Sequence, residues 1–98
     1  MDLQQINERL QQIIAELNKV IPELNKLEYA YNKRYFYTVL HSGMGNAAAR
    51  EAEANTVCDE EGLLKPFLDK KVDLRTLYNE KECLIEIGKN LRILHGNE

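Results

Sequence analysis

The side chains with the widest chemistry in this 98-residue sequence are two histidines, His41 and His95, and two cysteines, Cys58 and Cys83. Acid–base or nucleophilic catalysis needs a reacting group and a base within hydrogen-bond reach of each other. Each histidine is expected near a helix end, and in a hairpin closed at residues 42–46 the two lie at opposite ends. We therefore predict no catalytic residues and no enzymatic activity.

The cysteines and carboxylates also lack the spacing of a metal site. Cys58 and Cys83 form no CxxC pair, so we expect neither a disulfide framework nor zinc, and interpret both as small buried hydrophobes in a reducing compartment. Asp59, Glu60 and Glu61 are adjacent, and consecutive helical residues point in different directions. The two glycines near residue 44 lack a phosphate-loop spacing. No metal and no cofactor is predicted.

Aromatic and cationic side chains gather between residues 29 and 41, where Lys33 and Arg34 interleave with five rings. Rings beside cations suit single-stranded nucleic acid and protein hot spots alike. Five rings within nine helical residues point all round the helix, so one or two should face a partner or solvent. Packing in a core or self-interface, a partner protein, and a nucleic acid or nucleotide all stay open. The predicted partner-binding residues are Lys33, Arg34, Tyr35, Tyr37, His41 and Arg50.

The charge pattern argues against two kinds of partner. The net charge is -3 and the charged residues, 30% of the chain, alternate in sign, so no broad basic field would attract duplex DNA or an anionic membrane. The N-terminus lacks the features of a signal peptide, and no apolar stretch is long enough to span a bilayer. We expect a cytoplasmic protein, in the host cytoplasm if phage-encoded.

The elements that must position these residues are helices. Apolar residues at alternating steps of three and four form a heptad seam through the first part of the chain, which predicts a helix from about residue 3 to about residue 41. Pro22 lies inside it, yet the seam keeps its phase, so we expect a kinked but continuous helix. The seam residues are Leu3, Ile6, Leu10, Ile13, Leu17, Val20, Leu24 and Leu27.

The second half of the chain predicts a return. Residues 42–46 form a turn, in which Gly43 is expected to take a left-handed helix cap and Asn46 to cap the next helix. A short Ala- and Glu-rich helix follows over 47–61, and a kink or break over 62–66 separates it from a return helix that reaches about residue 95. The seam of that helix is Leu74, Leu77, Leu84, Ile87 and Leu91.

The predicted fold is all-α: residues 1–98 form a single helical domain, an elongated antiparallel helical hairpin with coiled-coil-like packing. Two long arms bury one face each and leave a thin core, so a two-helix hairpin rarely stands alone. We expect a homo-oligomeric helical bundle, most simply a dimer that forms four helices.

The second half also carries a family resemblance, in Arg-Glu-Ala-Glu at 50–53 and in the stretch from Leu-Tyr-Asn-Glu to Leu-Arg-Ile-Leu at 77–94. Behind a heptad helix, this layout resembles small helical-hairpin proteins from the early or recombination gene clusters of tailed phages and prophages of Firmicutes. Many such genes lie near those of single-strand annealing and single-stranded-DNA-binding proteins. The resemblance implies a phage setting.

Together these observations predict a binding protein that acts through protein–protein contacts, as an adaptor or as an inhibitor of a host or phage protein complex, including a host defence system. Two alternatives stay open. One is an accessory protein of phage DNA recombination or replication that contacts single-stranded nucleic acid or its binding proteins. The other is an oligomer that sequesters a small ligand.

Overall fold

The computed structural model describes residues 1–94, and these form three helices: α1 (Leu3–His41), α2 (Ala47–Glu60) and α3 (Leu64–Leu94). No strand occurs among the described residues. The predicted all-α helical hairpin is thereby confirmed. His95, where the sequence predicts that the return helix ends, belongs to residues 95–98 and lies outside the described part.

Helix α1 continues through Pro22 without interruption, as the unbroken phase of its seam predicts. Proline has no amide hydrogen, so the carbonyl of Asn18, four residues earlier, has no helical donor. Packing of the same apolar face before and after Pro22 compensates for this loss: Leu17 and Leu24, one heptad apart, are both buried. Side-chain burial therefore decides the backbone path here against local propensity.

The turn after α1 ends in a helix cap that the sequence predicts. The Asn46 side chain accepts a hydrogen bond from the backbone amide of Ala49 at 2.8 Å, which satisfies one of the free donors at the start of α2. The left-handed cap expected at Gly43 is wrong. Among the described glycines the positive φ belongs to Gly62, at 73°, and α1 ends with the Ser42 amide donating to the Val39 carbonyl.

Gly62 forms the break between α2 and α3. The amide of Gly62 donates to the Asp59 carbonyl at 3.0 Å and the amide of Leu63 donates to the Cys58 carbonyl at 2.9 Å. This pair of bonds is a Schellman motif, which ends a helix with a left-handed residue. Pro66 then lies in the first turn of α3, where its missing amide hydrogen has no helical acceptor to satisfy.

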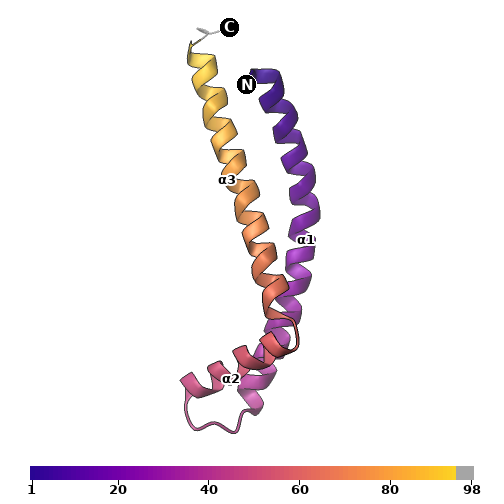
Figure 1. The fold of residues 1–98 in the computed structure, drawn as a ribbon, viewed down its shortest axis with the longest axis vertical. Coiled ribbons are helices and arrows are strands. Elements are labelled where there is room, and N and C mark those ends of the chain that lie inside the picture. Colours follow the sequence, from indigo (N-terminus) through magenta and orange to yellow (C-terminus); the bar gives the residue numbers. More distant parts are fainter. Residues whose placement is uncertain (95–98) are drawn as a thin grey trace. The chain divides into compact units, whose positions relative to one another are not determined.

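The chain divides into two compact units, and each is described by itself. Among the described residues, unit 1 contains residues 1–21 and 72–94, where the first part of α1 lies antiparallel to α3 (Figure 1). Its core consists of predicted seam residues, of which the buried ones are Ile6, Ile13, Leu17, Leu77 and Leu84. The partly buried residues packed against them are Ile21 and four further members of the predicted seam, Leu10, Val20, Leu74 and Leu91.

Ile87 does not belong to this buried seam, contrary to the sequence expectation, because its side chain is 38% exposed. Steps of four and three from Leu84 lead to Gly88 and Leu91, so the seam passes through a glycine that a search for apolar side chains overlooks. Gly88 is buried, and a Cβ atom added to it would lie 3.9 Å from Cγ2 of Ile6. That distance is ordinary van der Waals contact.

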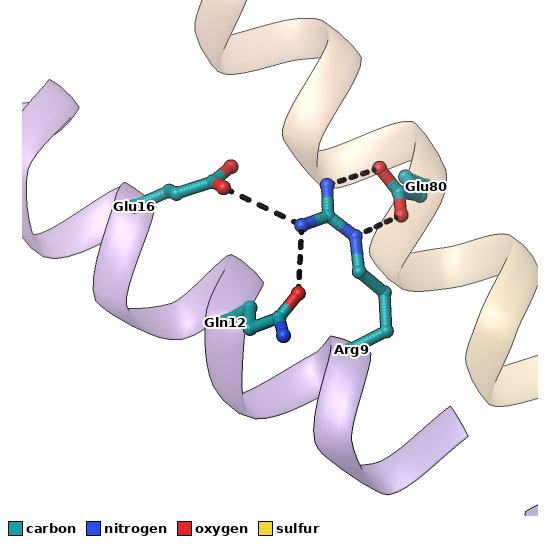
Figure 2. A network of polar contacts seen from close by, with 4 residues as sticks. All are labelled: Arg9, Gln12, Glu16 and Glu80. Carbon is teal, nitrogen blue, oxygen red and sulfur yellow. Dashed lines mark hydrogen bonds and ion pairs between the residues drawn. The ribbon is translucent and has the colours of Figure 1, made fainter. Parts of the chain in front are cut away.

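One flank of the unit 1 seam is closed by a polar network around Arg9 (Figure 2). The guanidinium donates from Nε and Nη2 to the two carboxylate oxygens of Glu80 on α3, at 2.5 and 2.8 Å. Its Nη1 also contacts Gln12 at 3.3 Å and Glu16 at 3.4 Å on α1. The two hydrogen bonds from Arg9, and secondarily its charge, lower the pKa of the Glu80 carboxyl.

Unit 2 contains residues 22–71, with α2 packed on the second part of α1. Ala54 and Cys58 are fully buried one turn apart on α2, and the Cys58 thiol donates to the Tyr31 carbonyl at 3.9 Å. Small side chains allow this close helix approach. Cys58 is thus the buried small residue that the sequence predicts, whereas Cys83 is exposed, so that half of the expectation is wrong.

Replacing a glycine by alanine should have opposite effects at Gly88 and Gly62. Gly88→Ala should raise the free energy of unfolding by about 0.5–1 kcal/mol, because alanine favours a helix and the added methyl group meets Ile6 without a clash. Gly62→Ala is the matched control and should lower it by about 1 kcal/mol, because its φ is left-handed. Urea denaturation measures both, and a destabilising Gly88→Ala would contradict the packing described.

The Arg9–Glu80 pair should add an acid-sensitive component to stability. Because the folded-state pKa of Glu80 is lowered, the stabilisation is complete above the ordinary carboxyl pKa and is lost as pH falls through the lowered value. Glu80→Gln should flatten this acid dependence. Thermal melts between neutral and acidic pH test it, with Glu82→Gln, on an exposed carboxyl, as control. Parallel acid limbs for wild type and Glu80→Gln would exclude the coupling.

Candidate functional site

The second part of α1 is apolar on two opposite sides. The inner side carries Leu24, Tyr31 and Thr38, spaced seven residues apart and turned toward the interior of unit 2. The Thr38 hydroxyl, the one buried polar side chain among the described residues, donates to the carbonyl of Arg34 at 2.8 Å. This side therefore accounts for the packing of unit 2.

Tyr31 connects all three helices of unit 2. Its ring lies 5.1 Å from that of Phe67 on α3 and is stacked 5.7 Å from that of Tyr35, and its hydroxyl donates to Asn55 on α2 at 2.9 Å. Burial raises the pKa of the Tyr31 hydroxyl above its ordinary value. Tyr31 is thus a packing residue and is not available to a partner.

The opposite side of α1 carries a second stripe that unit 2 does not cover. Tyr29, Lys33, Phe36 and Leu40 follow one another at steps of four, three and four, and we call these four residues the outer stripe. Tyr29 is 69%, Phe36 62% and Leu40 80% exposed, and Tyr37 beside them is 56% exposed. At about 100° per residue, the outer stripe lies diametrically across the helix from the inner side. Its contact with the rest of the unit is the edge-on packing of the Phe36 ring on Tyr35, 5.6 Å between centroids, and most of its apolar surface stays exposed.

A hollow of about 520 Å³ lies along this exposed side of α1. It is lined by Tyr29, Ala30, Lys33, Arg34 and Tyr37. The small side chain of Ala30 leaves room between the two tyrosines, which lie eight residues apart. Its size falls within the range of pockets that hold a small molecule or the anchoring side chain of a partner.

The cations beside the outer stripe differ in how they are engaged. Arg34 donates to Glu61 at 2.6 Å, and this hydrogen bond raises the pKa of its guanidinium. Arg50 donates to the Met44 carbonyl at 3.0 Å. Lys33 is exposed and, within residues 1–94, makes no ion pair or hydrogen bond. The charge of Lys33 is therefore not engaged by another side chain of the described part of the chain.

The predicted partner-binding residues separate into four placements. Lys33 and Tyr37 line the hollow, together with Arg34, whose charge is shared with Glu61. The His41 ring is exposed and lies 4.3 Å from that of Tyr37. Tyr35 is half-buried and packs on Tyr31 and, edge-on at 5.6 Å, on Phe36. Arg50 lies on α2 and braces the turn.

The partner-binding residues predicted from the sequence do not include Tyr29, Phe36 and Leu40, which the structure exposes beside the hollow. Choosing the bulky groups nearest the turn favoured Tyr35, which instead faces the inner side. The useful signal was available: extending the seam through Tyr31 to Thr38 assigns the inner side. The apolar residues left over, Tyr29, Phe36 and Leu40, follow at steps of seven and four, with Lys33 at the position between the first two. A second heptad stripe on one helix indicates a second packing surface.

The described residues contain few other groups that could react with a substrate or bind a metal. Burial raises the pKa of the Cys58 thiol, which disfavours the reactive thiolate. Residues 1–94 contain no group of three or more His, Cys, Asp or Glu side chains arranged to hold a metal ion. Among the same residues, no helix combines the length and the apolarity needed to cross a membrane.

Comparison with known proteins gives no further constraint: no family model, no curated protein and no solved structure matches this chain.

Proposed function

We propose that this protein is a non-enzymatic binding protein that docks another protein on the outer stripe of α1 and the hollow beside it. The observation that carries the proposal is the exposure of Tyr29, Phe36, Tyr37 and Leu40 on one side of one helix. With side chains of this size, the exposed apolar surface amounts to roughly 500 Å². Exposed apolar patches of this size on soluble proteins are often functional.

The composition of the surface favours a protein over single-stranded nucleic acid. Nucleic-acid grooves combine stacking rings with several cations that follow the phosphates. Here Arg34 is paired with Glu61 and Arg50 with a backbone carbonyl, which leaves Lys26 and Lys33 as the cations of this part of α1 that are unpaired within residues 1–94. Leu40, the most exposed of the group, provides no face for stacking. Tyrosine and arginine side chains around a hollow are instead the composition of a protein hot spot.

In this proposal the protein is an adaptor or an inhibitor of a larger complex, in the phage setting and cytoplasmic location that the sequence leads us to expect. An inhibitor of a host defence complex and an adaptor in phage recombination would both act through a docking surface and would need no catalytic residue. The identity of the captured protein distinguishes them.

We also propose that unit 1 provides a self-association surface. Arg9 and Glu80 each precede a buried seam residue by four positions, and Ile14 and Ile85 each follow one directly. Equivalent positions of two antiparallel helices fall on the same side of the pair, so the polar network occupies one flank and Ile14, Ile85 and Tyr78 the other. Ile14 is half-exposed although it borders the core. A second copy packed there would complete a four-helix bundle.

Ile14→Glu should convert the proposed dimer to a monomer, because it places a charge in the apolar flank. The adjacent Ala15→Glu adds the same charge on the solvent side of the helix and should leave the mass unchanged. Size-exclusion chromatography with light scattering measures both. A monomeric wild type, or an Ile14→Glu variant that retains the wild-type mass, would reject self-association through this flank.

Removing the outer stripe should abolish partner capture without unfolding the chain. We expect Phe36→Ser combined with Leu40→Ser to lose the proteins that the tagged wild type retains from nuclease-treated lysate of a Firmicute host, read by mass spectrometry. The control is Leu68→Ser combined with Val72→Ser, an exposed apolar pair of the same spacing on α3, which should retain them.

Circular dichroism melts verify that both double variants fold. Equal capture by wild type and the outer-stripe variant, or loss of every captured protein on nuclease treatment, would overturn the proposed function.

A further inference from the structure

We infer that the occupant of the outer stripe is an acidic amphipathic α-helix of another protein, an inference that rests on the proposed function. The apolar residues of the outer stripe and the cations beside it together specify this partner chemistry. All of these residues belong to unit 2.

The spacing of the outer stripe specifies a helix as its partner. Tyr29, Lys33, Phe36 and Leu40 repeat in heptad register over three turns of α1, which is about 17 Å at the rise of a helix. A partner helix laid along this line meets the repeat with its own apolar residues at three- and four-residue steps. The hollow between Tyr29 and Tyr37 accepts one larger apolar side chain of that helix.

The unpaired lysines on this side of α1 specify an acidic partner. Lys26 and Lys33 lie seven residues apart on the same side of α1, both exposed. Neither ammonium has a carboxylate within ion-pair distance among residues 1–94. The two carboxylates of this part of α1 lie elsewhere: Glu23 accepts from Lys70 at 2.8 Å, and Glu28 lies about 100° round the helix from Tyr29. Glu61 of α2 is paired with Arg34, so the exposed side is aromatic and its unpaired charge is positive.

This charge also argues against a second copy as the occupant. Two copies that face each other through the outer stripe would bring two lysines from each together, with no carboxylate of either stripe between them. Like charges placed together in an interface disfavour association. A helix with glutamates or aspartates at a seven-residue interval supplies the missing partners and keeps its apolar face on Phe36 and Leu40.

The probes are synthetic helices of one design with leucine at the heptad core positions. One carries glutamate at the flanking positions, a second carries lysine there, and a third has the acidic composition in scrambled order. A single-stranded oligonucleotide serves as the nucleic-acid probe. Fluorescence anisotropy against the full chain at moderate salt gives the affinities. The acidic amphipathic helix should bind at least about tenfold more tightly than the other three, as buried apolar contacts and charge complementarity act together.

A charge exchange provides the decisive variant. Lys26→Glu with Lys33→Glu should weaken the acidic helix by about tenfold or more and should restore binding to the lysine-bearing helix. The control Lys65→Glu changes an exposed lysine that is paired with Asp69 on α3 and should leave both affinities unchanged. Rescue by the oppositely charged helix cannot arise from misfolding of the variant.

Each other outcome overturns the inference in an identifiable way. Equal binding of the acidic and basic helices rejects the acidic class but leaves a protein-docking surface intact. Stronger binding of the oligonucleotide assigns the surface to nucleic acid. A lower oligomer mass for Phe36→Ser with Leu40→Ser assigns it to a second copy. If no helix binds and the outer-stripe variant still captures wild-type partners from lysate, the proposed function fails as well.

Discussion

The structure depends on the single apolar seam of α1, which keeps its phase over the whole helix and across Pro22. The seam buries Ile6, Ile13 and Leu17 against α3 in unit 1. Within unit 2 it buries Leu24 and Thr38, with the half-buried Tyr31 between them. One helical face therefore takes part in the core of each unit. This continuity stabilises a helix that contains a proline, because the packing of each unit adds to what local propensity lacks.

Small residues decide how closely the helices approach. Gly88 continues the seam of α3 beside Ile6, and Ala54 with Cys58 brings α2 against the backbone of Tyr31. None of these residues contributes a large apolar area, yet each occupies a fully buried position of its helix. Polar groups at the flanks, such as Arg9 with Glu80 and Tyr31 with Asn55, then fix which residues lie opposite one another.

The outer stripe differs from these contacts because most of its apolar surface stays exposed within its own unit. Aromatic residues between positions 29 and 40 exceed what one inner face can bury, and the excess lies on the far side of the same helix. Exposed aromatic side chains lower solubility and favour unwanted association. In the proposed function, their regular spacing beside Lys26 and Lys33 makes them a docking surface, and docking requires neither a titrating group nor a metal.

By itself the sequence determined the helical class, the continuous first helix, the turn with its Asn46 cap and most of the seam, because heptad periodicity and capping are local properties of consecutive residues. Tertiary structure decided the rest. It assigned Gly88 in place of Ile87 to the seam, exposed Cys83, moved the left-handed glycine from position 43 to 62, and turned Tyr35 inward while Tyr29, Phe36 and Leu40 turned outward. These outcomes depend on which neighbouring helix covers each face, and periodicity within one helix does not contain that information.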